Sequence, residues 1–85
     1  MYLRKLARAK ERVGEDVIVL FHRGDFYECY MDDAVAVANI TGVSLCHQIG
    51  GSVAKYPMVG FPHYALDTYL PLLLKADRRV AFFDE

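Results

Sequence analysis

The sequence VIVLFHRGDFYECY, residues 17–30, decides the fold, because it holds two strand-like runs and the turn between them. The first run, Val17–Phe21, is unbroken, apolar and rich in β-branched residues, which is typical of a strand covered on both faces. Arg23-Gly24-Asp25 is a turn signal, and Phe26–Tyr30 follows as a second, aromatic strand. These residues therefore predict a β-hairpin.

Helical patterns lie on both sides of this hairpin. Apolar residues recur at helical spacing through residues 1–13, with basic residues between them, and Gly14 is placed to end that helix. After the hairpin a second helix is expected, with Asp32 or Asp33 as its N-cap and Gly42 at its end. The hairpin is thus expected to be flanked by helices.

The second half of the chain predicts two more strands, a helix and a final strand. The predicted elements are, in order, a strand at Val43–His47, a mobile loop at Gly50-Gly51-Ser52, a strand at Tyr56–Phe61, a helix with Pro62 as its first residue, and a strand at Arg79–Phe83. Pro57 favours an edge strand or the first position of its strand, and Pro71 is expected to kink or restart the helix. The order predicts an α/β (α+β) fold, one domain over residues 1–85 with a mixed β-sheet flanked by helices.

Composition and charge exclude several classes of protein. The chain has 85 residues, of which 54% are hydrophobic and 25% charged, which excludes an intrinsically disordered chain. No apolar run is long enough to span a membrane, and Glu15 and Asp16 interrupt any signal-like segment, so we expect a cytoplasmic protein that does not contact membranes. The net charge of −1 argues against a general polyanion binder. Cys29 and Cys46 are expected to be reduced, partly buried thiols.

Residues that carry catalytic or metal chemistry do not form a recognisable motif. The densest acidic group consists of Asp25, Glu28, Asp32 and Asp33, and helix capping and solvation explain the last two more simply than a metal does. The histidines are single and scattered, at His22, His47 and His63. No phosphate-binding loop of the ATPase type is present. We therefore expect no enzyme, no metal and no cofactor.

Phe26 and Glu28 form the one pattern that suggests a specific function. Alternation along a strand places these two side chains on one face and Tyr27 on the other. An exposed Phe26 could wedge into or stack on a base step, while the Glu28 carboxylate could accept a hydrogen bond from a displaced base. From the spacing alone, a simple hairpin whose Phe26 ring is buried in the core is the favoured interpretation.

Several ordered motifs resemble the N-terminal mismatch-recognition domain (domain I) of the MutS DNA mismatch repair family. The matching segments are Tyr2-Leu3, Gly24-Asp25-Phe26-Tyr27-Glu28 with Tyr30 and Asp32-Asp33-Ala34, Val43-Ser44-Leu45, residues 57–65 (Pro-Met-Val-Gly-Phe-Pro-His-Tyr-Ala), Tyr69-Leu70, and Val80-Ala81-Phe82-Phe83-Asp84-Glu85. They cover nearly the whole chain at compatible spacing.

The resemblance implies roles for individual residues. Phe26 corresponds to the Phe that inserts beside a mispaired base, and Glu28 to the Glu that hydrogen-bonds the same base. Met58 is expected near this wedge, and Tyr27 is expected to face the core. Arg23 occupies a usually apolar position before the turn and is expected to contact a phosphate. The implied partner is double-stranded DNA with a mismatch or an unpaired base.

The chain also departs from the family's pattern. Full-length members continue into connector, lever, clamp and ATPase domains, so residues 1–85 are expected to bind DNA without hydrolysing ATP. Cys46-His47-Gln48 stands where the family commonly has basic residues, which removes phosphate contacts. The alternative is a protein-interaction module derived from this domain, which associates with a full-length MutS-type or other repair protein without binding DNA itself.

Overall fold

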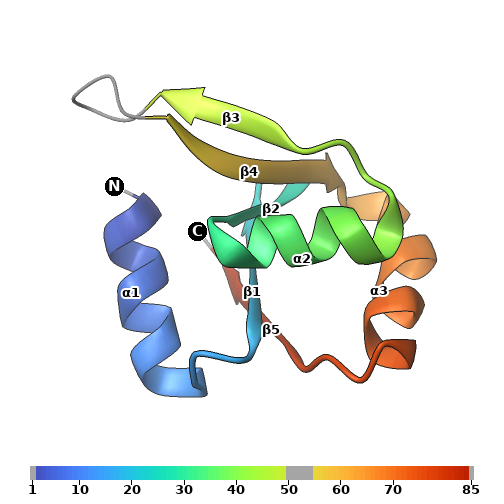
Figure 1. The fold of residues 1–85 in the computed structure, drawn as a ribbon, viewed down its shortest axis with the longest axis horizontal. Helices are drawn as coiled ribbons and strands as arrows, with labels where there is room; N and C mark the ends of the chain where they lie inside the picture. The colour runs from blue at the N-terminus through green and yellow to red at the C-terminus, as the bar shows by residue number, and fades with distance from the viewer. Residues whose placement is uncertain (1, 50–54, 85) are drawn as a thin grey trace.

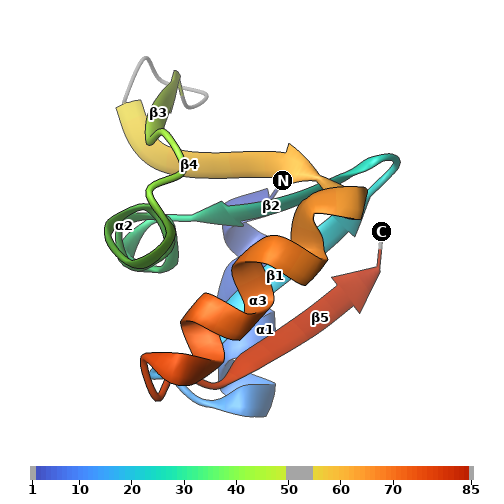
Figure 2. The ribbon, with the colours of Figure 1, turned by 90° about the vertical axis from the view of Figure 1, so that its right-hand side faces the viewer.

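The computed structural model describes residues 2–49 and 55–84 and contains a mixed sheet with helices on both faces (Figures 1 and 2). The elements are α1 (Tyr2–Val13), β1 (Ile18–Arg23), β2 (Phe26–Tyr30), α2 (Asp32–Thr41), β3 (Cys46–Ile49), β4 (Lys55–Pro62), the 3-10 helix η1 (His63–Ala65), α3 (Leu66–Lys75) and β5 (Val80–Asp84). This arrangement confirms the predicted α+β class. The loop expected at Gly50-Gly51-Ser52 lies outside the described residues.

The strands form one five-stranded sheet in the order β3-β4-β2-β1-β5. The pairs β1–β2, β2–β4 and β3–β4 are antiparallel, and β1–β5 is parallel. Since β1 lies inside the sheet, Ile18, Val19 and Leu20 are completely buried. The unbroken apolar run of the sequence therefore is a strand covered on both faces, as predicted.

Two hydrophobic clusters cover the two faces of this sheet. Ile18 and Leu20 of β1 pack with residues of α2 and α3, including Val37 and Leu73. On the other face, α1 packs against the alternate residues of β1 and against Tyr30 of β2. Figure 2 shows α3 and α1 on opposite sides of the sheet. None of the helices in the described part of the chain is long and apolar enough to cross a membrane.

The hairpin turn has the predicted position and is fixed on both sides. Arg23 pairs with Phe26, so only Gly24 and Asp25 connect the strands. Gly24 has a φ of +60°, which an L side chain rarely adopts. Phe26 pairs on its other side with Pro62, and the next amide, of His63, donates a hydrogen bond of 2.7 Å to the Asp25 carbonyl. The tip of the hairpin is therefore held by both neighbouring strands.

The prediction for the third strand was wrong in its position. Val43–His47 was expected, whereas β3 begins at Cys46. The amide of Val43 donates to the Thr41 hydroxyl at the end of α2, 3.2 Å away. This local bond occupies the Val43 amide, which is therefore not available for strand pairing.

The expectation that Pro57 lies on an edge strand or at the first position of its strand was also wrong, because β4 begins at Lys55 and lies between β2 and β3. Pro57 accepts the Met31 amide at 2.9 Å, and in an antiparallel pair the nitrogen of the same residue faces the same neighbour. That neighbour, β2, ends at Tyr30, and the Met31 carbonyl accepts the Val35 amide of α2 instead. The missing N–H of proline therefore leaves no strand bond unmade.

The helices begin and continue differently from the sequence predictions. Met31 is the N-cap residue of α2, without a side-chain capping bond, so neither Asp32 nor Asp33 caps it. Pro62 has extended backbone and ends β4, so it precedes η1 rather than starting a helix. Helix α3 is not restarted at Pro71, although proline removes one backbone donor. Leu73, completely buried just beyond Pro71, holds the following turn against the core. The predicted ends at Gly14 and Gly42 are confirmed.

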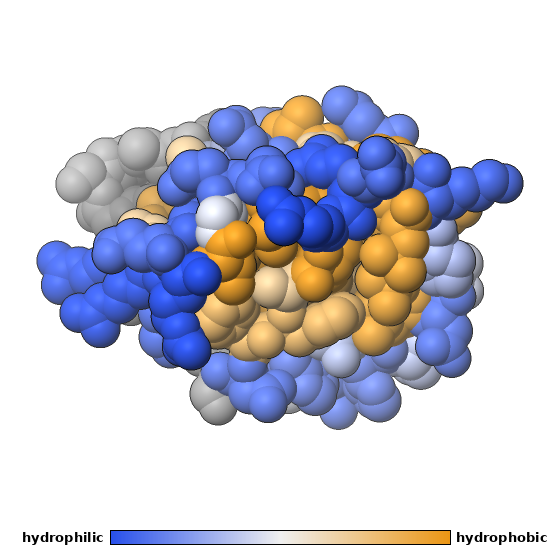
Figure 3. Space-filling model, turned by 90° about the horizontal axis from the view of Figure 1, so that it is seen from below, coloured by the Kyte–Doolittle hydropathy of each residue, from blue (hydrophilic) through white to orange (hydrophobic). Residues whose placement is uncertain are grey.

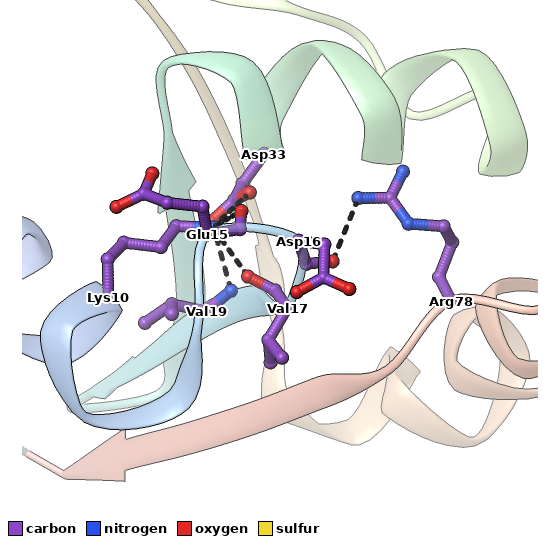
Figure 4. A network of polar contacts seen from close by, with 7 residues as sticks. All are labelled: Lys10, Glu15, Asp16, Val17, Val19, Asp33 and Arg78. Carbon is purple, nitrogen blue, oxygen red and sulfur yellow. Dashed lines mark hydrogen bonds and ion pairs between the residues drawn. The ribbon is translucent and has the colours of Figure 1, made fainter.

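Asp33 has a different role, in a buried network that joins three segments (Figure 4). Its Oδ1 lies 2.8 Å from the Lys10 ammonium of α1, and its Oδ2 accepts the Val19 amide of β1 at 3.0 Å. Lys10 also donates to the carbonyls of Glu15 and Val17. The Lys10 and Asp33 side chains are 10% and 4% exposed. The ion pair thus ties α1, β1 and α2 together.

The two thiols are both free but differ in environment. Cys29 is buried, and this burial raises the pKa of its thiol to about 12, whereas Cys46 is exposed rather than partly buried as expected. Because the thiolate is the reactive form, Cys29 is protonated and shielded at pH values near 8.

We expect iodoacetamide to add one group to the folded chain and two in guanidinium chloride, as measured by intact mass spectrometry. Equal modification of both thiols in the folded chain would contradict the buried position of Cys29.

Candidate nucleic-acid interface

Phe26 is exposed at the tip of the hairpin. It is the first residue of β2, and 47% of its surface is accessible. Its neighbours in the sheet, Arg23 and Pro62, hold the backbone but do not cover the ring. Of the two alternatives that the sequence left open, the buried Phe26 is therefore excluded.

Glu28 lies on the same face of β2, two residues from Phe26. Its side chain is only 14% exposed, and its Oε1 accepts hydrogen bonds from the Tyr30 hydroxyl and from Arg23, whose Nη1 is 3.4 Å away. Tyr27, between them, packs on the opposite face, where it stacks on His22 at a centroid distance of 4.7 Å. The alternation predicted for this strand is therefore confirmed.

The side chains of Met58 and Glu28 both lie close to Gly60, which has no side chain of its own. Gly60 pairs with Glu28 across β2 and β4. A Cβ added at Gly60 would lie 3.6 Å from the terminal methyl carbon of Met58 and 3.8 Å from Cγ of Glu28. The two side chains thus flank the same glycine. Met58 was expected near the Phe26 wedge; in the register Met58 lies opposite Tyr30 and Phe26 lies opposite Pro62, and a role of Met58 in the site stays a prediction.

Arg23 is half exposed at the base of the turn, with its guanidinium paired to Glu28. A cation there can approach a phosphate from the same side of the hairpin as Phe26, because Arg23 and Phe26 are register partners. The phosphate contact itself stays a prediction.

The position of the basic residues of α1 relative to the hairpin is visible only in the structure. This helix packs on the face of the sheet that carries Phe21 and Tyr30, which by alternation is also the face of Phe26 and Glu28. Its exposed basic side chains are Arg4, Lys5, Arg8 and Arg12. The last three line a pocket of about 270 Å³ whose other walls include Phe21 and Phe83. Net charge alone conceals this asymmetry, because it sums over all faces of the molecule.

The acidic residues do not converge on a metal site. Asp33 is bound to Lys10, Glu28 is bound to Arg23 and Tyr30, and Asp25 is in the turn. In the parts of the chain that the structure describes, no group of three or more His, Cys, Asp or Glu side chains is arranged to hold a metal ion.

A second exposed surface lies over β5 and α3, where apolar side chains gather on the underside of the molecule (Figure 3). The exposed large apolar residues of these two elements are Leu72, Leu74 and Phe82. β5 is also an edge strand of the sheet. Exposed apolar surface of this kind often marks contacts with other proteins.

Comparisons with known proteins agree with the motifs around the hairpin. The family model for MutS domain I matches residues 3–85. Three similar relatives, each named DNA mismatch repair protein MutS, come from Bacteroides fragilis (strain YCH46), Parabacteroides distasonis and Salinibacter ruber. The first two are each 49% identical over 70 residues, 82% of this chain and 8% of the relative. The third is 41% identical over 83 residues, 98% of this chain and 9% of the relative. The chain thus spans less than a tenth of the length of these relatives.

Proposed function

The chain belongs to the MutS domain I family, and from this premise we propose that it recognises mispaired or unpaired bases in double-stranded DNA for DNA mismatch repair. The observation that carries the proposal is the exposed Phe26 ring beside the Glu28 carboxyl group, on a hairpin tip fixed by two neighbouring strands. Residues 1–85 would act as one recognition domain. It binds DNA and catalyses no reaction of its own.

In this proposal Phe26 acts as a wedge. Unstacking a base step costs a few kcal/mol in an intact duplex, and stacking a base on an aromatic ring returns about 1–3 kcal/mol. A mispaired base is already poorly stacked, so the cost of insertion is lower there. The preference therefore comes from the deformability of the DNA more than from reading its sequence.

Glu28 would weaken binding to intact duplex DNA, whereas the basic residues would strengthen it. A carboxyl group near the wedge can hydrogen-bond a displaced base but is repelled by phosphates, so it weakens binding to ordinary duplex. Arg23 and the basic residues of α1 would attract the backbone on the same side of the sheet. Their contacts position the domain, and the Phe26–Glu28 pair selects the defect.

The test is a titration of labelled duplexes that carry a G·T mispair, an unpaired base or no defect, followed by fluorescence anisotropy. We expect tighter binding to both defective duplexes at low salt. Each phosphate contact steepens the salt dependence by about 0.9, so three contacts weaken binding roughly 40-fold between about 50 and about 200 mM salt. Equal binding to all three duplexes, or binding that salt leaves unchanged, would argue against the proposal.

A second candidate function rests on the surface over α3 and β5. Exposed Leu72, Leu74 and Phe82 would suit a domain that associates with a MutS-type or other repair protein. An apolar interface of this kind would be insensitive to salt, which separates it from DNA binding. Pull-down of a purified full-length MutS protein at high salt, without DNA, tests this alternative.

A further inference from the structure

The pocket of about 270 Å³ between α1 and the sheet is lined by cationic and aromatic side chains, and we call it the basic pocket. Its cations are Lys5, Arg8 and Arg12, which are spaced three and four residues apart and therefore share one face of the helix. Its aromatic walls are Phe21 of β1 and Phe83 of β5, whose ring centroids are 6.1 Å apart. Positive charge and aromatic surface thus meet in one small pocket.

Among the described residues that line the basic pocket, the one carboxylate faces away from it. This residue is Asp84, which is the register partner of His22, whereas Phe83 is the register partner of Phe21. Because side chains alternate along a strand, Asp84 lies on the other face of the sheet from the two rings. Its Oδ1 is 3.4 Å from Nδ1 of His22. The basic pocket is therefore suited to an anion.

The opposite side of α1 carries the reverse charge. A larger cavity of about 470 Å³ lies on that side, and its charged lining residues are Lys10, Glu11, Glu15, Asp32 and Asp33. Since Asp33 is paired with Lys10, the other carboxylates make this cavity negative. An anion is therefore expected to bind on one side of the helix and to be repelled from the other.

Arg12 offers a stacking surface in addition to its charge. Its guanidinium carbon lies 5.9 Å from the centroid of the Phe83 ring, within the range of a cation–π contact. A guanidinium group can stack on a nucleobase and can also bind two phosphate oxygens at once. Ligand sites for drug-sized molecules have volumes of about 300–1,000 Å³, so the basic pocket suits a smaller ligand.

We propose that the basic pocket binds the terminal phosphate monoester of a nucleotide, with the phosphate group at Lys5 and Arg8 and the base at Arg12 and Phe83. A phosphate monoester carries a charge of about −1.5 to −2 near neutral pH, whereas each phosphate of a DNA backbone carries a single charge. A compact group of cations therefore favours the monoester. This site does not include Phe26 or Glu28 and goes beyond the function proposed above.

The experiment is isothermal titration calorimetry of the chain at low salt with deoxyadenosine monophosphate, deoxyadenosine and inorganic phosphate. We expect the monophosphate to bind most tightly, because deoxyadenosine lacks the charge and inorganic phosphate lacks the ring. Arg8→Gln is expected to weaken binding of the monophosphate about tenfold, since it removes a charged donor. Glutamine is a comparable helix former, and thermal unfolding checks that this variant folds.

Arg4→Gln is the matched control. Arg4 is an exposed cation of the same helix that does not line the basic pocket, so its loss changes the net charge equally. We expect this variant to bind the monophosphate as wild type does. Equal weakening by Arg4→Gln and Arg8→Gln would show a general effect of charge and would overturn the inference.

Two further ligands identify the source of the phosphate group. They are a short single strand with a 5′-phosphate and the same strand with a 5′-hydroxyl. Tighter binding of the phosphorylated strand, lost in Arg8→Gln, assigns the basic pocket to strand ends, whereas binding of the free monophosphate alone assigns it to free nucleotides. Equal affinity for the monophosphate and inorganic phosphate, or no binding of either, overturns the inference. The preference for defective duplexes depends on Phe26, so these outcomes leave the proposed function untouched.

Discussion

Phe26→Ala is expected to abolish the preference of the chain for duplexes with a mispaired or unpaired base, and to leave its weak affinity for intact duplex nearly unchanged. The ring is 47% exposed, so its removal deletes the stacking surface and little of the core. Loss of stacking on one base corresponds to about 1–3 kcal/mol, or a factor of about 5 to 150 in affinity for the defective duplex. Anisotropy titrations of intact and defective duplexes measure both quantities.

Phe82→Ala is the matched control for this substitution. Phe82 is 46% exposed, nearly the same as Phe26, but its register partner is Leu20, so it lies on the opposite face of the sheet. We expect this variant to retain the preference for defective duplexes. If both variants lose the preference, the effect comes from a general loss of structure. If Phe26→Ala retains it, the wedge is not Phe26.

Asp33→Ala is expected to lower the free energy of unfolding by about 3–5 kcal/mol, because it breaks a buried ion pair and leaves the other charge without its partner. Lys10 would keep only carbonyl partners, and the Val19 amide would lose its acceptor. A domain of this size has a total stability of about 5–15 kcal/mol, so this single change threatens the fold. Urea denaturation followed by circular dichroism gives the difference.

Asp32→Ala controls for the loss of a negative charge at the start of α2. Asp32 is also in the first helical turn but is exposed, so its removal should cost less than about 1 kcal/mol. Similar destabilisation by both substitutions would mean that the helix end, and not the bond to Lys10, determines the role of Asp33.

The parts of the fold that the sequence predicts correctly depend on local chemistry. The β1–β2 hairpin follows from an apolar run, a Gly-Asp turn and an aromatic run, and Gly14 and Gly42 end their helices through positive φ angles. The exposure of Phe26 is different, because its spacing alone favours a buried ring. There the family resemblance supplied the expectation of an exposed ring, and in the structure Phe26 lies at the hairpin tip, next to the turn.

The wrong predictions depend on contacts between distant segments. Pro57 is tolerated inside the sheet because the Met31 carbonyl opposite it accepts the Val35 amide of α2, which no local pattern at Pro57 reveals. Asp33 resembles a helix cap in sequence, but its partner Lys10 is 23 residues away. The basic face of α1 is likewise visible only once the helix is placed on the sheet.

The hydrogen bond between the His63 amide and the Asp25 carbonyl has a consequence for how discrimination should vary with temperature. A hairpin tip held in this way loses little conformational entropy on binding. Most of the change in conformational entropy on binding therefore comes from the DNA. The ranking of lesions should then follow how readily each base step opens by itself. A defect whose base pairs open more often on warming should gain affinity relative to the other defects. The contribution of the protein to the binding free energy should change little with temperature.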